Sequence, residues 1–199
     1  FSKDVVEGTI LNEKEILSLD VNELQLSNGI KVIFKNTDFK NDEILFTGFS
    51  PGGHSLVSDE AYLSVVESAD IITMSGLGPF DQTQLEKYLS DKNVSVSPYI
   101  RELGEGFTGK STIKDLETAF EMIHLYFTEP KKDEIAYSSY IERMRGYLEN
   151  KNLSPDRVFF DSVKTIINSN HLRSRALNIK TLKNINLDAA YNGFVDRFK

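Results

Sequence analysis

Cysteine and tryptophan are absent from this chain of 199 residues, and histidine occurs only three times. Without cysteine there are neither disulfide bonds nor thiolate metal ligands, so the chain is compatible with an oxidising or a reducing compartment. Long apolar runs are also missing. Because about 18 consecutive apolar residues are needed to cross a bilayer, membrane insertion is not expected.

Clustered positive charge is the next absence. The chain has 23 Lys and Arg residues against 30 Asp and Glu residues, a formal net charge of −7. Binding to a phosphate backbone needs grouped basic side chains that displace counterions. The basic clusters here are small and interspersed with acids, so nucleic acid is excluded as an expected partner.

The three histidines are His54, His124 and His171, and no two have the i, i+4 spacing that places two imidazoles on one helix face around zinc. His124 lies beside an apolar helix face and is expected to be a hydrogen-bonded boundary residue. The other two lie in expected loops, where they would be solvated. We therefore expect no metal ligand and no catalytic residue in this chain.

Residues 104–109 (GEGFTG) match the dinucleotide-binding pattern G-x-G-x-x-G, which is meaningful only between a strand and the helix of a parallel βαβ unit. The helix that follows here leads into further helices, and Glu102 and Glu105 would repel a pyrophosphate. Turn glycines of a hairpin are the better interpretation. Acidic pairs such as Asp59-Glu60 stand where helices begin, which the helix dipole alone favours.

What is present is ordinary for a globular protein: 40% hydrophobic and 27% charged residues, in a length that suits one compact domain. Residues 8–19 show no clean period, and residues 1–21 are interpreted as an interdomain linker. Alternating segments predict strands at 24–34, 42–50, 94–100 and 106–111. The first is a hairpin around Asn28-Gly29, a pair that favours a type I′ turn.

Helical periodicity follows residue 58, where Ser58 is the expected cap. Residues 114–127 are expected to bury a face made of Leu116, Ala119, Phe120, Ile123 and Phe127. Further helices are predicted at 62–72, from about 81, and at 133–151, 155–168 and 187–198. These elements predict an α+β fold, a two-layer sandwich of mostly antiparallel sheet packed against helices.

Five motifs in a fixed order resemble the pitrilysin and insulinase family of zinc peptidases. They are LSNGIKV at 26–32, SPGG at 50–53, VSVSPY at 94–99, YFTEP at 126–130 and HLRSR at 171–175. The match runs from about residue 22 to 199, and more narrowly it is similar to the first domain of the C-terminal, non-catalytic half of a bacterial, periplasmic-type member. By this resemblance, residues 22–199 are a peptidase domain that lacks the zinc motif and is truncated at its C-terminal end.

The resemblance implies a four-domain parent protein whose halves close around a peptide. In such a parent, zinc is held in the N-terminal half by an inverted H-x-x-E-H motif whose Glu is the general base. The matching helix here is 62–72, where Glu67 has no imidazole to accompany it. The third ligand of the family is a Glu on a helix comparable to 133–151, which offers Glu142 and Glu149.

The resemblance thus implies a non-catalytic domain of a zinc metalloendopeptidase that degrades peptides, located in the periplasm or cell envelope. Its partners would be a peptide substrate and the other domains of the same polypeptide, as part of a closed chamber wall. The expected substrate contact is strand 94–100 through Val96, Ser97, Pro98 and Tyr99, by strand addition, although Pro98 removes one donor. An alternative is a scaffold or binding module from a wholly inactive relative, in which the parent would lack the H-x-x-E-H helix.

Overall fold

The computed structural model describes residues 8–151 and 153–199. The chain divides into two compact units, Phe1–Glu43 and Ile44–Lys199, where its length suggested one compact domain. Each unit has a three-stranded sheet, and in both sheets all neighbouring strands are antiparallel. In the part of the chain that is described, no helix is both long and apolar enough to cross a membrane.

The first unit is a meander of β1 (Ile10–Ile16), β2 (Val21–Leu26) and β3 (Lys31–Phe34). β1 lies inside the segment for which the sequence showed no period. The reason is that six of its seven residues are exposed, so backbone pairing with β2 defines the strand and leaves no buried face to generate a pattern. The role of residues 1–21 as an interdomain linker stays a prediction.

The hairpin at Asn28-Gly29 is confirmed, but its turn is not type I′. Gly29 has a φ of 89°, whereas Asn28 is not among the residues with positive φ. A type I′ turn needs positive φ at both central residues. Instead, the Asn28 side chain accepts a hydrogen bond from the backbone N–H of Ile30 at 3.1 Å, which stabilises a longer connection between β2 and β3.

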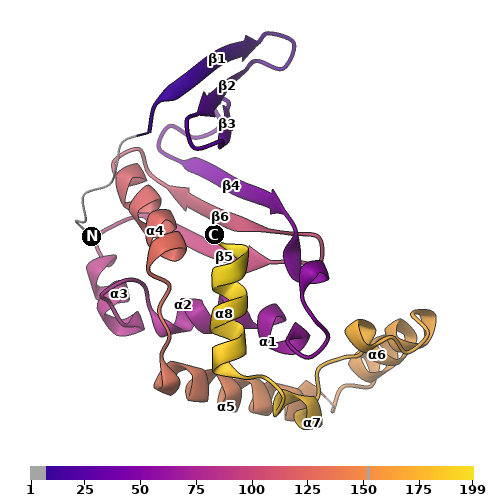
Figure 1. The fold of residues 1–199 in the computed structure, drawn as a ribbon. Helices are drawn as coiled ribbons and strands as arrows, with labels where there is room; N and C mark the ends of the chain where they lie inside the picture. The colour runs from indigo at the N-terminus through magenta and orange to yellow at the C-terminus, as the bar shows by residue number, and fades with distance from the viewer. Residues whose placement is uncertain (1–7, 152) are drawn as a thin grey trace. The chain divides into compact units, whose positions relative to one another are not determined.

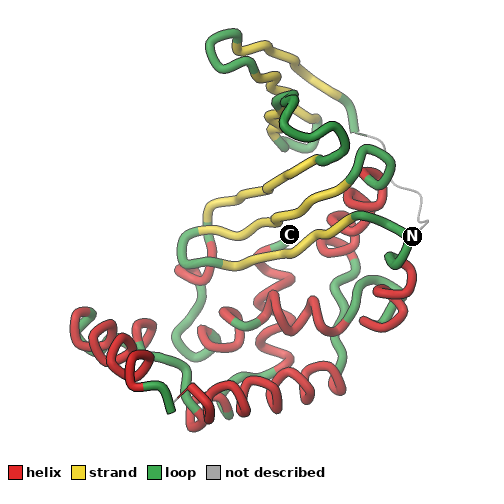
Figure 2. Tube along the Cα trace, turned by 180° about the vertical axis from the view of Figure 1, so that it is seen from behind, coloured by secondary structure: helices red, strands yellow, loops and turns green. Residues whose placement is uncertain are grey.

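The second unit has a sheet in the order β4-β6-β5, formed by β4 (Ile44–Pro51), β6 (Gly104–Ser111) and β5 (Val94–Ile100). The predicted hairpin of β5 and β6 is confirmed, and β4 pairs with the far side of β6. Figures 1 and 2 show the helices of this unit gathered on one face of the sheet. The predicted α+β class, with antiparallel sheet packed against helices, is confirmed.

The helices follow the predicted order with two differences. The predicted helix at 62–72 is broken into α1 and α2 at Glu67, and the four-residue helix α7 has no periodic signal in the sequence. The helical elements are η1 (Gly53–Leu56), α1 (Tyr62–Val66), α2 (Ser68–Ser75), α3 (Gln82–Tyr88), α4 (Leu116–Thr128), α5 (Glu134–Lys151), α6 (Pro155–Ile167), η2 (Leu172–Ser174), α7 (Ile179–Leu182) and α8 (Leu187–Arg197).

Side chains cap several of these helices. Asp81 and Gln84 form a reciprocal capping box at α3, and the Asn186 side chain accepts from the backbone N–H of Ala189 at the start of α8. Ser58 is not the expected cap, because α1 begins after Ala61 and the Ser58 hydroxyl accepts only from the Ala61 N–H, at 3.4 Å. The turn before α1 displaces Ser58 from the capping position.

The buried face of α4 differs from the predicted one. Phe120 is 61% exposed and Phe127 44% exposed. The sequence carries two overlapping apolar stripes on this helix, and the tertiary contacts select the one that includes Thr118. The buried residues are Thr118, Ala119, Met122, Leu125 and Tyr126.

Phe107 in the centre of β6 connects the sheet to the helices. Its ring lies 4.9 Å from the ring of Phe198 and 5.7 Å from that of Tyr126 on α4. Phe194 of α8 stacks on Phe198 at 4.4 Å. Aromatic contacts of this kind add about 0.5–1.5 kcal/mol to burial, so this cluster fixes α4 and α8 against the sheet.

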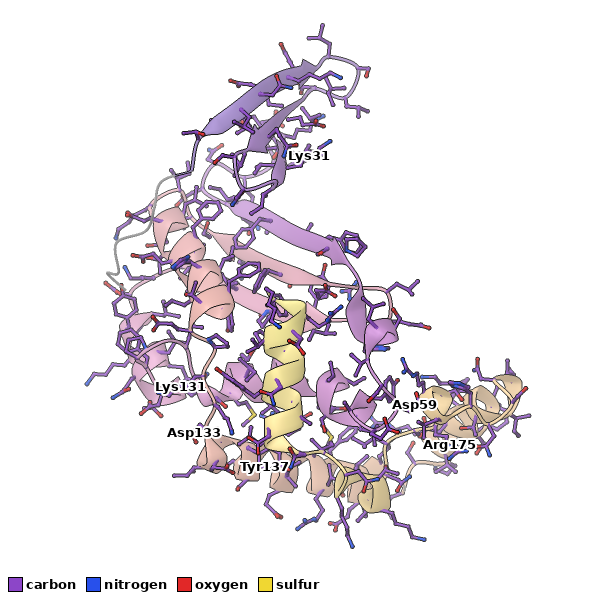
Figure 3. All side chains as sticks on the ribbon, viewed as in Figure 1. Lys31, Asp59, Lys131, Asp133, Tyr137 and Arg175 are labelled. Atoms are coloured by element: carbon purple, nitrogen blue, oxygen red, sulfur yellow. The ribbon has the colours of Figure 1, made fainter. Side chains whose placement is uncertain are left out.

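A second hydrophobic cluster, separate from the aromatic cluster around Phe107, joins α2, α5, α7 and α8. α5 begins where the Asp133 side chain accepts from the backbone N–H groups of Ile135 and Ala136. The Tyr137 hydroxyl then donates to the Ile185 carbonyl at 2.7 Å (Figure 3). The buried members of the cluster are Ile71, Tyr140, Leu148, Leu182, Ile185, Leu187 and Ala190.

α6 is the exception to this packing. The structure describes all thirteen of its residues, and none of them is buried. In Figure 1 the helix stands beyond the end of α5. Its exposed apolar side chains are Val158, Phe159, Phe160, Ile166 and Ile167.

The glycines of GEGFTG are strand glycines of β6, not turn glycines. A Cβ on Gly104 would lie 2.4 Å from the Phe49 ring, and one on Gly109 would lie 2.3 Å from the Phe46 ring. On Gly106 a Cβ would lie 2.0 Å from the Gly48 carbonyl oxygen. These positions lack side chains because aromatic rings and backbone of neighbouring strands occupy the space.

Replacing Gly106 by Ala is therefore expected to destabilise the protein by about 2–3 kcal/mol, because backbone must move to admit the methyl group. Gly146 of α5 is the matched control, since a Cβ there meets nothing within 4 Å. Gly146→Ala is expected to raise stability by up to about 1 kcal/mol through helix propensity. Urea unfolding measures both, and equal effects would contradict this account of β6.

Candidate functional site

The predicted contact strand β5 is an edge strand. Among the described residues, it pairs with β6 on one side and with no strand on the other. The Arg101 N–H donates to the Gly104 carbonyl at 2.8 Å, and the Thr112 N–H donates to the Asn93 carbonyl at 3.2 Å. Antiparallel ladders alternate, so Ser95, Ser97 and Tyr99 also face β6 with their backbone groups.

The backbone groups on the unpaired side therefore belong to Val94, Val96, Pro98 and Ile100. Pro98 does not interrupt the ladder with β6, since its missing N–H would have pointed to the unpaired side. The remaining groups present N–H and C=O in the alternating arrangement that an extended chain can pair with. The geometry of this edge is compatible with strand addition.

The four residues predicted to contact substrate lie together on β5 but on opposite faces. Val96 and Pro98 are buried toward the helices, while Ser97 is exposed on the other face of the sheet. Tyr99 shares that face and is half-buried. We call the face of the sheet whose side chains point away from the helices the open face.

Tyr99 is fixed on the open face by contacts across the sheet. Its hydroxyl donates to the Gly48 carbonyl on β4 at 2.9 Å, so the ring spans the central strand at Gly106. The guanidinium of Arg101 lies 4.6 Å from the centre of the same ring. This is a cation–π contact, which orders the Arg101 side chain.

The SPGG motif has a structural role at the end of this hairpin. Gly53 has a φ of 67°, and a Cβ there would lie 2.2 Å from the Arg101 carbonyl oxygen. Its N–H donates to the buried carboxylate of Glu105, and the His54 N–H donates to the Arg101 carbonyl at 2.9 Å. The loop thereby holds the turn between β5 and β6, which positions Arg101.

Glu67 stands at the break between α1 and α2, where the resemblance placed the catalytic carboxylate. Its side chain accepts a hydrogen bond from the hydroxyl of Tyr140 on α5. Burial raises the pKa of the Glu67 carboxyl above its ordinary value, the Tyr140 hydrogen bond opposes this, and nearby Asp70 adds to it. Burial and the Glu67 carboxylate together raise the pKa of Tyr140.

Neither candidate for the third ligand faces Glu67. Glu142 is exposed and pairs with Arg145 at 2.8 Å, and Glu149 is also exposed. The position of α5 that meets α2 is Tyr140, a phenol that stays protonated. The side chain opposite Glu67 is therefore a hydrogen-bond donor.

The histidines lie in three separate places. His124 is exposed on α4, not at a boundary, and the His171 side chain accepts from the Arg173 N–H at 3.3 Å. His54 is half-buried where a solvated loop residue was expected, with its ring 5.1 Å from that of Tyr62. Burial lowers the pKa of His54.

Zinc does not fit the donor set at Glu67. Zinc sites use three or four imidazole, thiolate or carboxylate ligands. Across residues 8–151 and 153–199, no three His, Cys, Asp or Glu side chains form a group that could hold a metal ion. Glu67, which the resemblance matches to the general base, accepts a hydrogen bond from Tyr140.

Arg173 of the HLRSR motif is a residue whose role the sequence did not reveal. It donates to the His54 carbonyl at 2.8 Å and pairs with Asp59 at 2.9 Å. Its guanidinium also lies 4.9 Å from the Tyr62 ring. Figure 3 labels Asp59 and Arg175 on the two chain segments that this residue joins. The motif therefore ties the start of α1 to η2.

Two curated proteins are related to the chain in sequence. It is 27% identical over 187 residues to the "Zinc protease PQQL-like" of Arabidopsis thaliana, covering 92% of this chain. It is 21% identical over 183 residues to the "Probable zinc protease PqqL" of Haemophilus influenzae, covering 89% of this chain. No family model matches the chain.

Solved structures agree in fold. The periplasmic protease PqqL of Escherichia coli has a TM-score of 0.79 at 14% identity over 100% of this chain, and 22% of its own. The ferredoxin protease FusC, solved as a mutant in complex with Arabidopsis ferredoxin, has a TM-score of 0.81 and a sequence identity of 15%. The match covers 99% of this chain and 22% of the FusC chain. The "peptidase M16 inactive domain" of Pseudomonas fluorescens has a TM-score of 0.69 and a sequence identity of 12%. The match covers 87% of this chain and 42% of the Pseudomonas chain.

The resemblance to the pitrilysin and insulinase family is confirmed. The relatives in sequence are zinc proteases, and the fold is that of peptidase domains, one of them described as inactive. The chain spans 17% and 20% of the length of the two curated relatives.

Replacing Glu67 by Gln should preserve the fold, because a glutamine oxygen also accepts from Tyr140. The raised pKa of Glu67 means that the folded state binds more protons than the unfolded state above pH 4.5. Its contribution to stability is present below that pH and is lost as pH rises through the folded pKa. Urea unfolding between pH 4 and 8 should show this decline in the native protein and not in the variant.

Tyr140→Phe is the matched control. It removes the donor and leaves the Glu67 carboxyl without its partner, which should cost about 1–3 kcal/mol at neutral pH. A Glu67→Gln variant that folds normally but abolishes turnover of the parent protein would contradict the structural role and make Glu67 a catalytic base.

Proposed function

We propose that this chain is a non-catalytic domain of a zinc metalloendopeptidase that degrades peptides, contributing to the wall of a closed chamber and to substrate binding. The observation that carries the proposal is the pairing of Glu67 with Tyr140. The chain is related to zinc proteases, and the resemblance matches Glu67 to their general base. In this structure the Glu67 carboxylate accepts a hydrogen bond from Tyr140 of the neighbouring helix α5.

The zinc then lies in the N-terminal half of the parent protein, outside these residues, and this domain belongs to the C-terminal half. Its partners are then the other domains of the polypeptide and a peptide or small protein substrate. The complex of the ferredoxin protease FusC with ferredoxin supports a protein substrate by analogy of fold. A periplasmic location rests in the same way on the periplasmic PqqL of Escherichia coli.

Substrate binding is assigned to the unpaired edge of β5. Backbone groups of Val94, Val96 and Ile100 are aligned there for pairing, and Pro98 contributes its carbonyl. The Tyr99 contact to β4 and the SPGG loop hold the strand rigidly, so little entropy is lost when a peptide binds. Main-chain pairing gives affinity for many sequences, which suits an enzyme that degrades peptides.

Val96→Pro tests this edge because it removes an N–H that points to the unpaired side and leaves the ladder with β6 intact. The expected result is about fivefold weaker binding of extended peptides to the parent protein, the effect of one hydrogen bond. Fluorescence anisotropy measures the affinity. Val96→Ala is the control, because it removes similar packing but keeps the N–H. Equal affinities for the two variants would overturn the edge as the peptide site.

A scaffold or binding module from a wholly inactive relative is the alternative function, and metal analysis separates the two. We expect one zinc per parent polypeptide and no stoichiometric zinc in purified residues 1–199, measured by mass spectrometry after dialysis against a weak chelator. A parent protein without zinc supports the scaffold. One tightly held zinc per 199-residue chain would overturn both accounts.

A further inference from the structure

The strand residues named on the open face of the second unit include a cation and no carboxylate, in an acidic protein. Its exposed strand residues include Ser95 and Ser97 on β5 and Thr108 and Lys110 on β6. On β4 the exposed ones are Leu45, Thr47 and Phe49. Among these described residues there is one cation and no carboxylate, although the chain as a whole carries a net charge of −7.

Arg101 continues this face beyond the end of β5. The backbone N–H of Arg101 donates to β6, as that of Tyr99 does. Because alternate residues of a strand share a face, the Arg101 side chain lies on the same face as Tyr99. Arg101 is exposed, and its guanidinium lies over the Tyr99 ring at 4.6 Å. A guanidinium stacked in this way keeps the N–H donors along its edge available for a carboxylate.

The nearest carboxylates in the sequence are directed elsewhere. Glu105 points to the helical side, where it accepts from the Gly53 N–H. Among the described residues Glu102 forms no ion pair with Arg101, and its charge acts to raise the pKa of His54 and of Tyr62, which belong to η1 and α1. The positive charge of Arg101 is therefore presented on the open face next to the unpaired edge.

A strand added to β5 would place every second side chain on the open face. The residue directly opposite Tyr99 would have its Cβ about 5 Å from that of Tyr99, whichever direction the peptide runs. Its side chain would lie beside the stacked guanidinium. A carboxylate at this position would meet a planar donor group that is already ordered by the ring beneath it.

We propose that Tyr99 and Arg101 form a subsite that selects an acidic side chain, Asp or Glu, at the peptide position opposite Tyr99. The inference rests on the proposed function of the β5 edge and adds a preference to it. Arg101 supplies the charge, and Tyr99, held by the Gly48 carbonyl, fixes where the charge lies.

The test uses the parent protein and a series of extended peptides of neutral polar sequence, in which a single glutamate is moved along the peptide. Each peptide is compared with its glutamine analogue by fluorescence anisotropy. One position is expected to favour glutamate by about threefold at low salt, and the ratio should fall as salt is added.

Variants locate the effect. Arg101→Gln should reduce the ratio of glutamate-peptide to glutamine-peptide affinity to one, while the glutamine peptides bind as before. Arg101→Lys should keep part of the preference, since lysine retains the positive charge but lacks the planar pair of guanidinium N–H donors. Lys110→Gln is the matched control. It removes the same charge from the open face at a point remote from Tyr99 and should leave the ratio unchanged.

The outcomes separate the two proposals. Val96→Pro should weaken glutamate and glutamine peptides alike and preserve their ratio. Equal affinity for both peptides in the native protein, or an unchanged ratio in Arg101→Gln, overturns the acidic subsite and leaves the edge site standing. If no extended peptide binds the native parent protein, both proposals are wrong.

Discussion

The absence of side chains at Gly104, Gly106 and Gly109 of β6 is the constraint on which the sheet of the second unit depends. Gly104, Gly106 and Gly109 admit rings from the neighbouring strands, so the central strand is covered by its neighbours' aromatic residues. Phe107, between these glycines, carries the contact to α4 and α8. With β6 central, β5 is left at the edge, and its backbone geometry follows from the pairing.

The strands and helices with regular burial could be predicted from the sequence. β5 and β6 alternate, and α8 combines a helical period with a capping asparagine. β1 could not be predicted, because a strand with one side chain partly buried leaves no apolar pattern. The face of α4 was predicted wrongly, since Phe120 and Phe127 are as apolar as the residues that are buried, and helical spacing alone does not separate the two apolar stripes.

The candidate site was partly accessible from the sequence. The sequence lacks the paired histidines of a zinc helix, and the resemblance suggested Val96, Ser97, Pro98 and Tyr99 as substrate contacts. The structure places these four residues on an edge strand, and their contact with substrate stays a prediction. The partner of Glu67 could not be found, because Tyr140 is 73 residues away and belongs to an amphipathic helix like any other. The roles of Arg101 and Arg173 depend on which rings they cover, and ring contacts leave no spacing in a sequence.

Glu67 and Tyr140 connect α5 to the segment that the resemblance matches to a catalytic helix. A buried carboxyl needs a hydrogen-bond donor, and Tyr140 on the adjacent helix provides one. The break between α1 and α2 lies at Glu67. The result is a contact that holds two helices together.

Pro98 has a further consequence for the exposed side of β5. An unprotected strand edge can recruit copies of itself and grow into fibrils, a hazard that natural sheets limit by interrupting the row of donors. A proline whose missing N–H faces outward does this without weakening the sheet behind it. Pro98 thus removes one donor from the row of backbone groups with which a second copy of the chain could pair.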